Sequence, residues 1–398
     1  MAIICRLDLK TKHHLITFFN TLLMIIGLLK EALPELRVAL LPESVATLAK
    51  MEISLLVEEG SGAGAFASDA EYILAGAKIT TKEEVIREAT MLIKINAMTE
   101  EELSLTGEGK ILLAVINPYF NPDQVIKLAE KNVTCFSLDI IPRTSRAQAM
   151  DILSSMATIA GYKAVLTAAN TLPKFFPMFM TAAGTIIPAK VLILGAGVAG
   201  LQAIATSRKL GAVVEVFDVR AAVKEEVQGL GGKFVEVEGA LDDKAAGGYA
   251  VEQTEEFKKK QEMAVHDHAI KSDVVICTAQ IPGKKAPVLL KKETVEGMKP
   301  GSVIIDIAAS TGGNCELTRN NETVVHQGVK IIGNSFFPVE LSSDASKMFG
   351  KNVINFLKLM FNSNGEFNLN WEDDLIKGTC ITHNREIVNE KIKAVIKS

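Results

Sequence analysis

The sequence has few cysteines, and their spacing excludes two common structural devices. The five cysteines are scattered and include no C-x-x-C pair: Cys5, Cys135, Cys277, Cys315 and Cys380. We therefore expect neither a disulfide framework nor a zinc or other metal site, and a reducing compartment fits best. Positive charge is also limited, because the net charge is -4 and no Lys/Arg cluster is interleaved with aromatic residues. Nucleic acid is not an expected partner.

Long hydrophobic runs are scarce as well. The one membrane-like stretch, residues 15–29, is interrupted by Thr17, Asn20 and Thr21 and is shorter than the roughly 20 residues that a spanning helix needs. No small-residue cleavage site follows it, which disfavours a secretory signal. We predict no transmembrane span here. Residues 1–23 are expected to be an N-terminal extension: a linker, a helix that packs on the domain, or a targeting segment.

Histidine is missing from the centre of the chain, where none occurs between His14 and His266. Dehydrogenases of alcohols, amines or hydroxy acids move a proton together with the hydride, commonly with His or Lys. His266 and His268 lie in a polar, helix-like stretch, and we expect both to be solvated. Hydride exchange between two nicotinamides requires orientation but no acid or base. The missing histidine therefore favours such an exchange over ordinary dehydrogenation.

What the sequence does contain is enough apolar residues for two domain cores. The chain has 398 residues, of which 48% are hydrophobic and 23% charged, as is typical of a globular protein. From about Met24 to Asp139, helical patterns alternate with short apolar runs at residues 53–57, 92–95, 111–116 and 133–138. This alternation indicates parallel strands with crossover helices. A helical pattern without proline at residues 145–171 predicts a long connector.

The predicted fold is α/β, with two Rossmann-like domains that have parallel sheets, are separated by a cleft and are joined by long helices. We assign residues 24–144 plus 345–398 to the first domain, 145–172 to the connector helix and 173–344 to a nucleotide-binding domain. Apolar residues at helical spacing in 344–361 predict the return helix that carries the chain back to the first domain.

The most informative motif opens the second α/β unit. An apolar run at residues 190–194 is followed by Gly195-Ala-Gly197-Val-Ala-Gly200 and by a second apolar run that ends before Asp218. This is the dinucleotide fingerprint, in which the glycines let a pyrophosphate approach a helix N-terminus. Asp218 would accept hydrogen bonds from the adenosine ribose and disfavour a 2′-phosphate, so NAD(H) is preferred. Arg220 could pair with a 2′-phosphate, which leaves NADP(H) open.

Two further segments are weaker candidates. The glycine-rich residues 60–64 follow an apolar run, but Phe66 begins a new turn rather than a long apolar helix. We therefore do not predict a nucleotide site there. Near the start of the connector lie four closely spaced polar residues: Arg143, Gln148, Asp151 and Ser154. They are suited to holding a nicotinamide carboxamide at the interdomain cleft, although a solvated helix N-terminus would have the same spacing.

The residues around this polar cluster resemble a known signature. The segments Ile141-Pro-Arg143-Thr-Ser-Arg146-Ala-Gln148-Ala-Met-Asp151-Ile-Leu-Ser154 and Ile159-Ala-Gly161-Tyr resemble one shared by alanine dehydrogenases and the NAD(H)-binding domain I of proton-translocating transhydrogenases. Further matches to the transhydrogenases are Phe176-Pro-Met-Phe-Met, Gly247-Gly-Tyr249-Ala, Ile281-Pro-Gly-Lys-Lys and Gly312-Gly-Asn-Cys-Glu316. Together these matches extend from about Met24 to Val395, nearly the whole chain.

The resemblance to transhydrogenases implies roles for individual residues. Arg143, Asp151 and Ser154 would hold the nicotinamide carboxamide and ribose of NAD(H), and Gln148 would reach the NADP(H) nicotinamide of a partner. Tyr249 would belong to a mobile loop that folds over the bound nucleotide. The remaining implied nucleotide contacts are Val198, Ala199, Val219, Gly248, Thr278, Ala279 and Gln280. The last of these stands where an aliphatic residue is usual in the family.

The resemblance also implies an assembly and an activity. The activity would be Re/Si-specific, proton-translocating hydride exchange between NAD(H) on this chain and NADP(H) on a partner component. The expected partners are a second copy in a homodimer, an NADP(H)-binding domain and a membrane-spanning domain. The chain would then be a membrane-associated extrinsic component that faces the cytoplasm or an organelle matrix.

Two other functions stay open. Alanine dehydrogenases carry a substrate-binding lysine and a catalytic histidine in their first domain. Lys94 lies near the expected lysine position, but the predicted strand at residues 112–120 offers no histidine. Alanine dehydrogenation would therefore lack its acid/base group. The remaining function is a redox sensor that binds NAD(H) without catalysis, and binding without hydride transfer would identify it.

Overall fold

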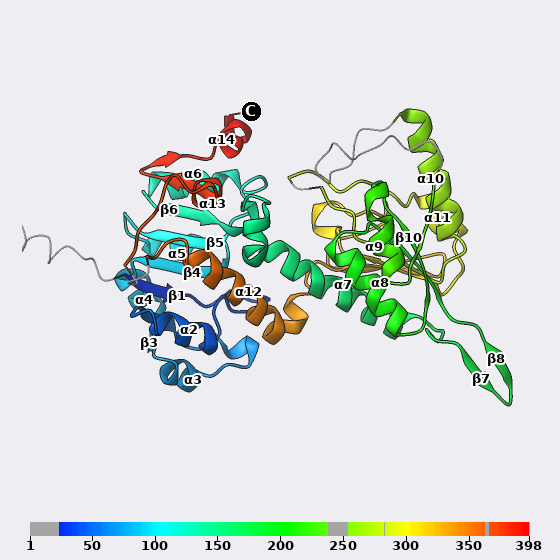
Figure 1. Cartoon of the computed structure of the whole chain (residues 1–398), viewed down its shortest axis with the longest axis horizontal. Helices are drawn as coiled ribbons and strands as arrows, with labels where there is room; N and C mark the ends of the chain where they lie inside the picture. Colours follow the sequence, from blue (N-terminus) through cyan, green and yellow to red (C-terminus); the bar gives the residue numbers. More distant parts are fainter. Residues whose placement is uncertain (1–23, 238–253, 282, 363–365, 398) are drawn as a thin grey trace, which may run out of the picture. The chain divides into compact units, whose positions relative to one another are not determined.

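The computed structural model describes residues 24–237, 254–281, 283–362 and 366–397. The chain divides into two compact units (Figure 1). Unit 1 contains Met1–Ile152 and Ser342–Ser398, and unit 2 contains Leu153–Leu341. The chain therefore leaves unit 1 once and returns to it, and each unit builds its own sheet and its own core.

Unit 1 is built on an eight-stranded sheet with the order β17-β16-β6-β5-β4-β1-β2-β3. Its parallel strands are β1 (Ile25–Leu28), β2 (Ser54–Glu58), β3 (Lys78–Thr80), β4 (Met91–Asn96), β5 (Ile111–Val115) and β6 (Thr134–Ser137). The C-terminal strands β16 (Cys380–His383) and β17 (Glu386–Ile387) extend one edge in antiparallel pairing. The four strands predicted from apolar runs correspond to β2, β4, β5 and β6, with ends that differ by about one residue.

The helices of unit 1 begin at residues suited to helix N-termini. They are α2 (Pro42–Ala49), α3 (Asp69–Leu74), α4 (Lys82–Glu88), α5 (Glu100–Leu105), α6 (Pro122–Glu130), α12 (Ser342–Leu357), α13 (Asp374–Thr379) and α14 (Glu390–Lys397), with the 3-10 helices η1 (Ala63–Ala65), η2 (Leu138–Ile140) and η3 (Ser145–Met150). Ser68, Thr81 and Thr99 accept hydrogen bonds from the first turns of α3, α4 and α5. The return helix predicted at residues 344–361 is α12, which ends at Leu357.

Unit 2 contains a seven-stranded sheet with the order β11-β10-β9-β12-β13-β15-β14. The strands are β9 (Lys190–Leu194), β10 (Val213–Phe217), β11 (Lys233–Phe234), β12 (Val274–Cys277), β13 (Val303–Asp306), β14 (Glu322–His326) and β15 (Val329–Gly333). All neighbours are parallel except β14 and β15. The chain builds outward from β9 to β10 and β11 and then continues on the other side with β12. The strand order therefore reverses between β9 and β12, where sheets of this kind bind ligands.

The strands of unit 2 are buried on both faces because helices cover both sides of the sheet. The helices are α7 (Ile152–Thr171), α8 (Val198–Lys209), α9 (Lys224–Gly229), α10 (Glu255–Ala269) and α11 (Lys292–Gly297), with 3-10 helices η4 (Ala221–Val223), η5 (Ala309–Thr311) and η6 (Val339–Leu341). Val191 and Ile193 of β9 pack with α7 and α8 in one core. Leu192 and Leu194 pack with α10 and α11 in another. Alternation along one strand thus supplies both cores.

A two-stranded hairpin extends from unit 2 (Figure 1). It consists of β7 (Phe179–Thr181) and β8 (Gly184–Ile186), and every residue of both strands is exposed. Its turn contains Gly184, whose φ of 119° lies in the region that favours glycine. The proline- and glycine-containing stretch before the fingerprint forms this hairpin, although its sequence predicts only a connection.

The predicted connector is not one continuous helix. Residues Ser145–Met150 form the 3-10 helix η3, and the α-helix begins at Ile152. Asp151 between them has an extended backbone. Ala147 and Met150 are both buried, and a spacing of three residues places them on one face of a 3-10 helix. The expectation that the helix begins at Ser145 was wrong because this short apolar pair favours the tighter turn.

One helix in the described part of the chain, α7, is long and apolar enough to cross a membrane by length and composition. Ala160, Ala164, Val165 and Ala168 of this helix lie in the core of unit 2. The membrane-like stretch at residues 15–29 ends in β1, a strand between β4 and β2, and residues 1–23 lie outside the described part. The α/β class with two Rossmann-like sheets is confirmed, with antiparallel strands added at the edges.

Candidate functional site

The glycines of the fingerprint form the turn between β9 and α8. Gly195 has a φ of 103°, and a Cβ there would lie 2.7 Å from the Thr278 Oγ1 atom. A Cβ at Gly200 would collide with the carbonyl oxygen of Gly195, whereas a Cβ at Gly197 would meet no heavy atom within 4 Å. The first and last of these glycines are therefore required by packing. Gly197 instead leaves one side of the backbone open to an approaching group.

The N-terminus of α8 lies directly after this turn. Gly197 is its N-cap residue, so no side chain caps the helix, and Val198 and Ala199 form its first turn. Exposed N–H groups and the positive end of the helix dipole make such a terminus suited to phosphate. Gly161 of α7 fixes the helix from behind, because a Cβ there would collide with the Ala199 carbonyl oxygen. The geometry of the glycines and of the helix end fits a dinucleotide.

Asp218 follows β10 and connects it to the fingerprint turn. Its Oδ2 atom accepts a hydrogen bond of 2.6 Å from the backbone N–H of Ala196. Its Oδ1 atom accepts one of 2.8 Å from the backbone N–H of Arg220, and the Arg220 guanidinium donates to both carboxylate oxygens at 3.0 and 2.9 Å. Only 6% of the Asp218 side chain is exposed. Val219, between the two charged residues, is partly exposed beside them.

The loop after β12 lies beside the fingerprint. The Thr278 hydroxyl donates to the Gly195 carbonyl oxygen at 3.0 Å, so the ends of β9 and β12 are tied together at the point where the strand order reverses. The Ala279 backbone exchanges two hydrogen bonds with the side chain of Asn314, at 2.9 and 2.8 Å. Gln280 is exposed, and its amide approaches the Ile307 carbonyl oxygen at 3.5 Å. Thr278, Ala279 and Gln280 form the second wall of the candidate site.

Asn314 and Asp306 support this wall, and the sequence analysis assigned neither a role. Asp306 ends β13 and is fully buried, and its Oδ2 atom accepts hydrogen bonds from the Asn314 N–H and the Thr318 hydroxyl, both at 2.7 Å. Burial raises the pKa of Asp306, while these donated hydrogen bonds act in the opposite direction. The available signal was the Gly312-Gly-Asn-Cys-Glu316 motif, which matched the family without a stated function.

The four residues predicted to position the nicotinamide follow one another along the chain, but they do not lie in one unit. Arg143, Gln148 and Asp151 belong to unit 1, whereas Ser154 lies in the first turn of α7 in unit 2. Arg143 and Gln148 are exposed, and Asp151 and Ser154 are half-buried. The other predicted cofactor residues, Gly248 and Tyr249, lie outside the described residues.

The histidines of the second half are held by neighbouring side chains. His268 Nδ1 lies 2.6 Å from Glu215 Oε2, and His266 Nδ1 lies 3.0 Å from the Thr294 hydroxyl. The expectation that both are solvated was wrong, because α10 turns this side of the helix toward β10 and α11. Within the described ranges, no group of three or more His, Cys, Asp or Glu side chains could hold a metal ion.

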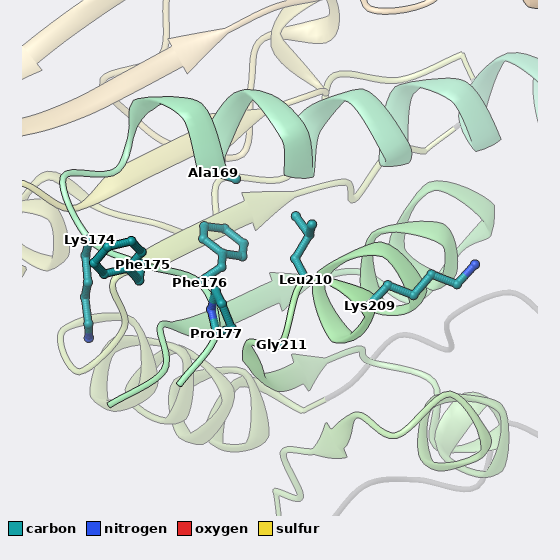
Figure 2. A pocket seen from close by; sticks show the side chains of 8 residues that line it. All are labelled: Ala169, Lys174, Phe175, Phe176, Pro177, Lys209, Leu210 and Gly211. Carbon is teal, nitrogen blue, oxygen red and sulfur yellow. The ribbon is translucent and has the colours of Figure 1, made fainter. Parts of the chain in front are cut away.

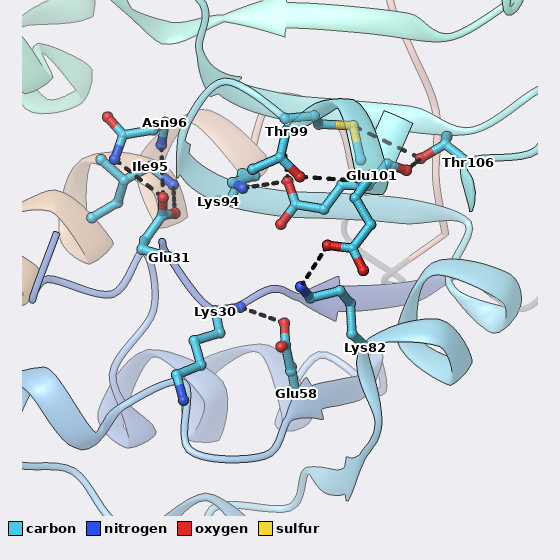
Figure 3. Close-up of polar contacts among 12 residues, drawn as sticks. Lys30, Glu31, Glu58, Lys82, Lys94, Ile95, Asn96, Thr99, Glu101 and Thr106 are labelled. Carbon is cyan, nitrogen blue, oxygen red and sulfur yellow. Dashed lines mark hydrogen bonds and ion pairs between the residues drawn. The ribbon is translucent and has the colours of Figure 1, made fainter. Parts of the chain in front are cut away.

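The corresponding strand ends of unit 1 are occupied by the unit's own charged side chains (Figure 3). Glu31 follows β1, and its carboxylate accepts hydrogen bonds from the backbone N–H groups of Ile95 and Asn96 at the end of β4. Burial raises the pKa of Glu31, although Lys94 and the donated hydrogen bonds lower it. An internal carboxylate thus takes up the amides that end β4, the strand beside which the order of unit 1 reverses.

Lys94, the residue relevant to alanine dehydrogenation, is buried in the same region. Its ammonium group lies 2.7 Å from the Glu102 carboxylate, and the two side chains are 1% and 2% exposed. Glu102 also accepts a hydrogen bond of 2.8 Å from the backbone N–H of Thr99, as part of a capping box. The charge of Lys94 is therefore neutralised within the protein, away from solvent.

The glycine-rich segment at residues 60–64 packs against its own unit. A Cβ at Gly62 would lie 2.6 Å from the Ala67 carbonyl oxygen and from the Tyr72 ring. A Cβ at Gly64 would lie 2.5 Å from the carbonyl oxygen of Leu36. Phe66 has a left-handed backbone and ends η1, as the predicted turn requires, and only the six-residue helix α3 follows. These glycines allow close packing rather than an approach by a ligand.

A hollow of about 470 Å³ lies elsewhere in unit 2 (Figure 2). Its lining residues come from the end of α7, the segment before the hairpin and the end of α8: Ala169, Lys174, Phe175, Phe176, Pro177, Lys209, Leu210 and Gly211. The hollow is therefore at the C-terminal end of α8, whereas the fingerprint is at the N-terminal end of that helix. Lys174 is engaged by Asp273 at 2.8 Å. The hollow is separate from the candidate nucleotide site.

The parallel sheet of unit 2, the glycine turn at its strand reversal and the acidic residue after the second strand define a dinucleotide-binding α/β protein. The chain belongs to the alanine dehydrogenase/PNT family. The family's N-terminal domain matches residues 27–160, and its C-terminal domain matches residues 164–390. The predicted family is therefore confirmed over nearly the whole chain.

Individual relatives favour one branch of this family. The first portion of the NAD(P) transhydrogenase alpha subunit of Rhodospirillum rubrum, a separate chain, is 45% identical over 376 residues, covering 92% of this chain and 98% of the relative. A crystal structure of transhydrogenase from Sinorhizobium meliloti has a TM-score of 0.84 and 40% identity, covering 92% of this chain and 100% of the other. An alanine dehydrogenase of Methanococcus maripaludis is 29% identical over 316 residues, covering 77% of this chain and 79% of the relative.

Proposed function

We propose that this chain is the NAD(H)-binding component of a proton-translocating, Re/Si-specific transhydrogenase. It exchanges hydride with NADP(H) held on a partner component, and a membrane-spanning domain couples the exchange to proton movement. The chain forms a homodimer and is an extrinsic component of the membrane complex, facing the cytoplasm or an organelle matrix. The similarity to the Rhodospirillum rubrum transhydrogenase alpha subunit over 92% of the chain supports this proposal.

The observation that carries the cofactor preference is the pairing of Asp218 with Arg220. A carboxylate at this position accepts hydrogen bonds from the ribose hydroxyls of NAD(H) and repels the 2′-phosphate of NADP(H). Arg220 is the residue that could have reversed this preference, but its guanidinium donates to Asp218 at 3.0 and 2.9 Å. Its positive charge is therefore largely balanced by the neighbouring carboxylate, which favours NAD(H) over NADP(H).

The reaction itself requires positioning of two nicotinamides. Bound NADH supplies a hydride, so that NADH and NADP⁺ become NAD⁺ and NADPH without transfer of a proton by the protein. The amides at the N-terminus of α8 hold the pyrophosphate, and Asp218 fixes the adenosine end. Arg143, Asp151 and Ser154 hold the nicotinamide carboxamide and ribose, Tyr249 contacts the bound nucleotide, and Gln148 orients the nicotinamide of the partner. None of these roles needs a group that titrates near neutral pH.

Alanine dehydrogenation would need an accessible cation for the carboxylate of its substrate. Lys94 is 1% exposed and paired with Glu102, which disfavours that function. Pyruvate, ammonia and NADH should therefore give no turnover with this chain. Steady formation of alanine that is abolished by Lys94→Ala would assign the chain to the other branch of the family.

The proposal is tested with the chain, NADH and the NADP(H)-binding component of a related transhydrogenase. The chain alone should bind NADH much more tightly than NADPH in a titration of nicotinamide fluorescence. After mixing with the partner and NADP⁺, a single turnover of NADH oxidation should be visible by absorbance. Gln148→Asn should slow that turnover by a factor on the order of 100 with NADH affinity nearly unchanged. Tight binding of NADH without any transfer would instead identify a sensor.

A further inference from the structure

The segment that carries Gln148 has little support of its own. It is the six-residue 3-10 helix η3, and of its residues only Ala147 and Met150 are buried. Hydrogen bonds in 3-10 helices have poorer geometry than those in α-helices, and long 3-10 runs are uncommon for this reason. Gln148 itself is exposed. The orientation of its side chain therefore depends on what holds the backbone on either side of it.

Two asparagines of the return helix α12 hold the backbone directly after Gln148. The Asn352 Nδ2 group donates to the Ala149 carbonyl oxygen at 2.9 Å, and the Asn355 Nδ2 group donates to the same oxygen at 3.1 Å. The two donors are 203 and 206 residues away from Ala149 in the sequence. A single carbonyl of a 3-10 helix is thus held by two amides from one helix face, within unit 1.

Asn352 is retained at a cost to stability. It is 7% exposed, and its Oδ1 atom has no hydrogen-bond partner among the described residues. A buried polar atom without a partner destabilises a fold, and an apolar residue of similar size would remove that penalty. The Ala149 carbonyl oxygen would still be satisfied by Asn355 after such a change. The hydrogen bond from Asn352 is therefore not needed for satisfying this carbonyl, but it restricts the position of η3.

The residues directly before Gln148 are held by the segment around α13. The Arg146 guanidinium pairs with Asp373 at 2.9 Å and also with Asp374. Pro142 packs so closely on Gly378 of α13 that any side chain at Gly378 would collide with it. Asp373 at the same time caps α13 by accepting a hydrogen bond of 2.9 Å from the Leu375 N–H. Arg146 is therefore attached to a fixed helix end rather than to a mobile side chain.

We infer that the C-terminal return segment, through Asn352, Asn355 and the Asp373–Asp374 pair, is the positioning element that aims Gln148. This inference rests on the function proposed above for Gln148. The two attachments flank that residue at Arg146 and Ala149, so they fix the direction in which its side chain leaves the backbone. None of the four residues is assigned a contact with a nucleotide, and their effect passes through the backbone of η3. Small misplacements of a group that orients reactants are costly to the rate.

The decisive variant is Asn352→Leu, because it separates positioning from stability. We expect the single-turnover rate of hydride transfer to fall about tenfold, with the NADH dissociation constant unchanged. The melting temperature should stay the same or rise, since the unpaired Oδ1 atom is removed. Hydrogen exchange of residues 144–151 should become faster. Ser207→Ala is the matched control, because it removes another buried oxygen without a partner among the described residues, far from η3 in the sequence, and should leave the rate unchanged.

The second attachment is tested with Arg146→Met, which should also slow transfer about tenfold without weakening NADH binding. Arg146→Lys keeps a cation within reach of both carboxylates and should recover most of the rate. Arg385→Met removes another exposed arginine pair of unit 1, with Glu108, and should have no effect.

The results distinguish this inference from the proposed function. Wild-type rates in both Asn352→Leu and Arg146→Met, measured while Gln148→Asn remains slow, would overturn the inference and leave the proposed function intact. Loss of rate that only follows loss of melting temperature would also overturn it, because the residues would then act through stability. Complete absence of transfer by the wild-type chain with its partner would overturn both.

Discussion

Asp218→Asn is the substitution that tests the candidate site most directly. The Asp218 carboxylate accepts from the Ala196 N–H at 2.6 Å and from the Arg220 N–H at 2.8 Å, and the guanidinium donates to both of its oxygens. An asparagine keeps one of the two oxygens and replaces the other with an NH2 group, which donates. One set of donors, either the fingerprint amide or the arginine, must then face another donor.

The expected magnitude follows from these contacts. Hydrogen bonds to a charged group contribute about 1–3 kcal/mol, and the ribose hydroxyls would lose a charged acceptor. NADH should therefore bind about 5- to 150-fold more weakly. NADPH should bind more tightly than to the wild type, because Arg220 is released from its carboxylate and is 27% exposed. The ratio of the two dissociation constants should change by more than either constant alone.

A titration of nicotinamide fluorescence measures both constants, and Asp273→Asn provides the matched control. Asp273 is also a mostly buried carboxylate of unit 2, and it accepts from Lys174 at 2.8 Å and from the Lys190 N–H at 2.9 Å. It precedes β12, whereas the fingerprint lies after β9, so it is at the other end of the parallel strands. Both variants should lower the melting temperature, but only Asp218→Asn should change nucleotide affinity. Unchanged NADH affinity in Asp218→Asn would refute the assignment.

Three other predictions concern buried or paired groups. Glu102→Gln leaves Lys94 charged and buried, so it should destabilise unit 1 by about 3–5 kcal/mol, and Lys94→Met with Glu102→Leu should recover most of this in thermal unfolding. In a Cys5→Ser background, a thiol reagent should modify no cysteine until the protein unfolds, because burial raises the pKa of all four described thiols, to about 12 for Cys380. The hydrogen bond from Arg146 lowers the pKa of Asp373 below 3.8. Stability from this pair is therefore lost only in acid below that value, and the Arg146→Met effect should be constant from about pH 6 to about pH 9.

The elements with local sequence patterns were predictable. The apolar run after Lys190, the glycine turn and the acid after Phe217 appear in the structure as β9, the turn at Gly195 and Asp218. Each of these depends on residues close in the sequence or on the burial of a whole strand. The hairpin at β7 and β8 was missed, since its residues are exposed on both faces and show no alternation between buried and exposed positions.

The contacts that shape the site were not predictable, because they join residues far apart in the chain. Asn352 and Ala149 are 203 residues apart, and Arg146 and Asp373 are 227 apart. Asn314 reaches Ala279 across 35 residues and holds the wall beside the fingerprint. Even the Asp218–Arg220 pair, two residues apart, could not be inferred, since the sequence allowed Arg220 to serve a phosphate instead.

The two units show how one topology leads to different chemistry. In each, the first strand lies between the second and the fourth, so a strand reversal offers a ligand site at the same place. In unit 2 the turn after the first strand is short, rich in glycine and followed at once by α8, which leaves backbone donors for a pyrophosphate. In unit 1 the turn instead carries Glu31, whose carboxylate accepts from the N–H groups of Ile95 and Asn96. A carboxylate within the fold thus takes the place that an anionic ligand would take, and this difference supports one NAD(H) site on the chain and a second nucleotide on a partner.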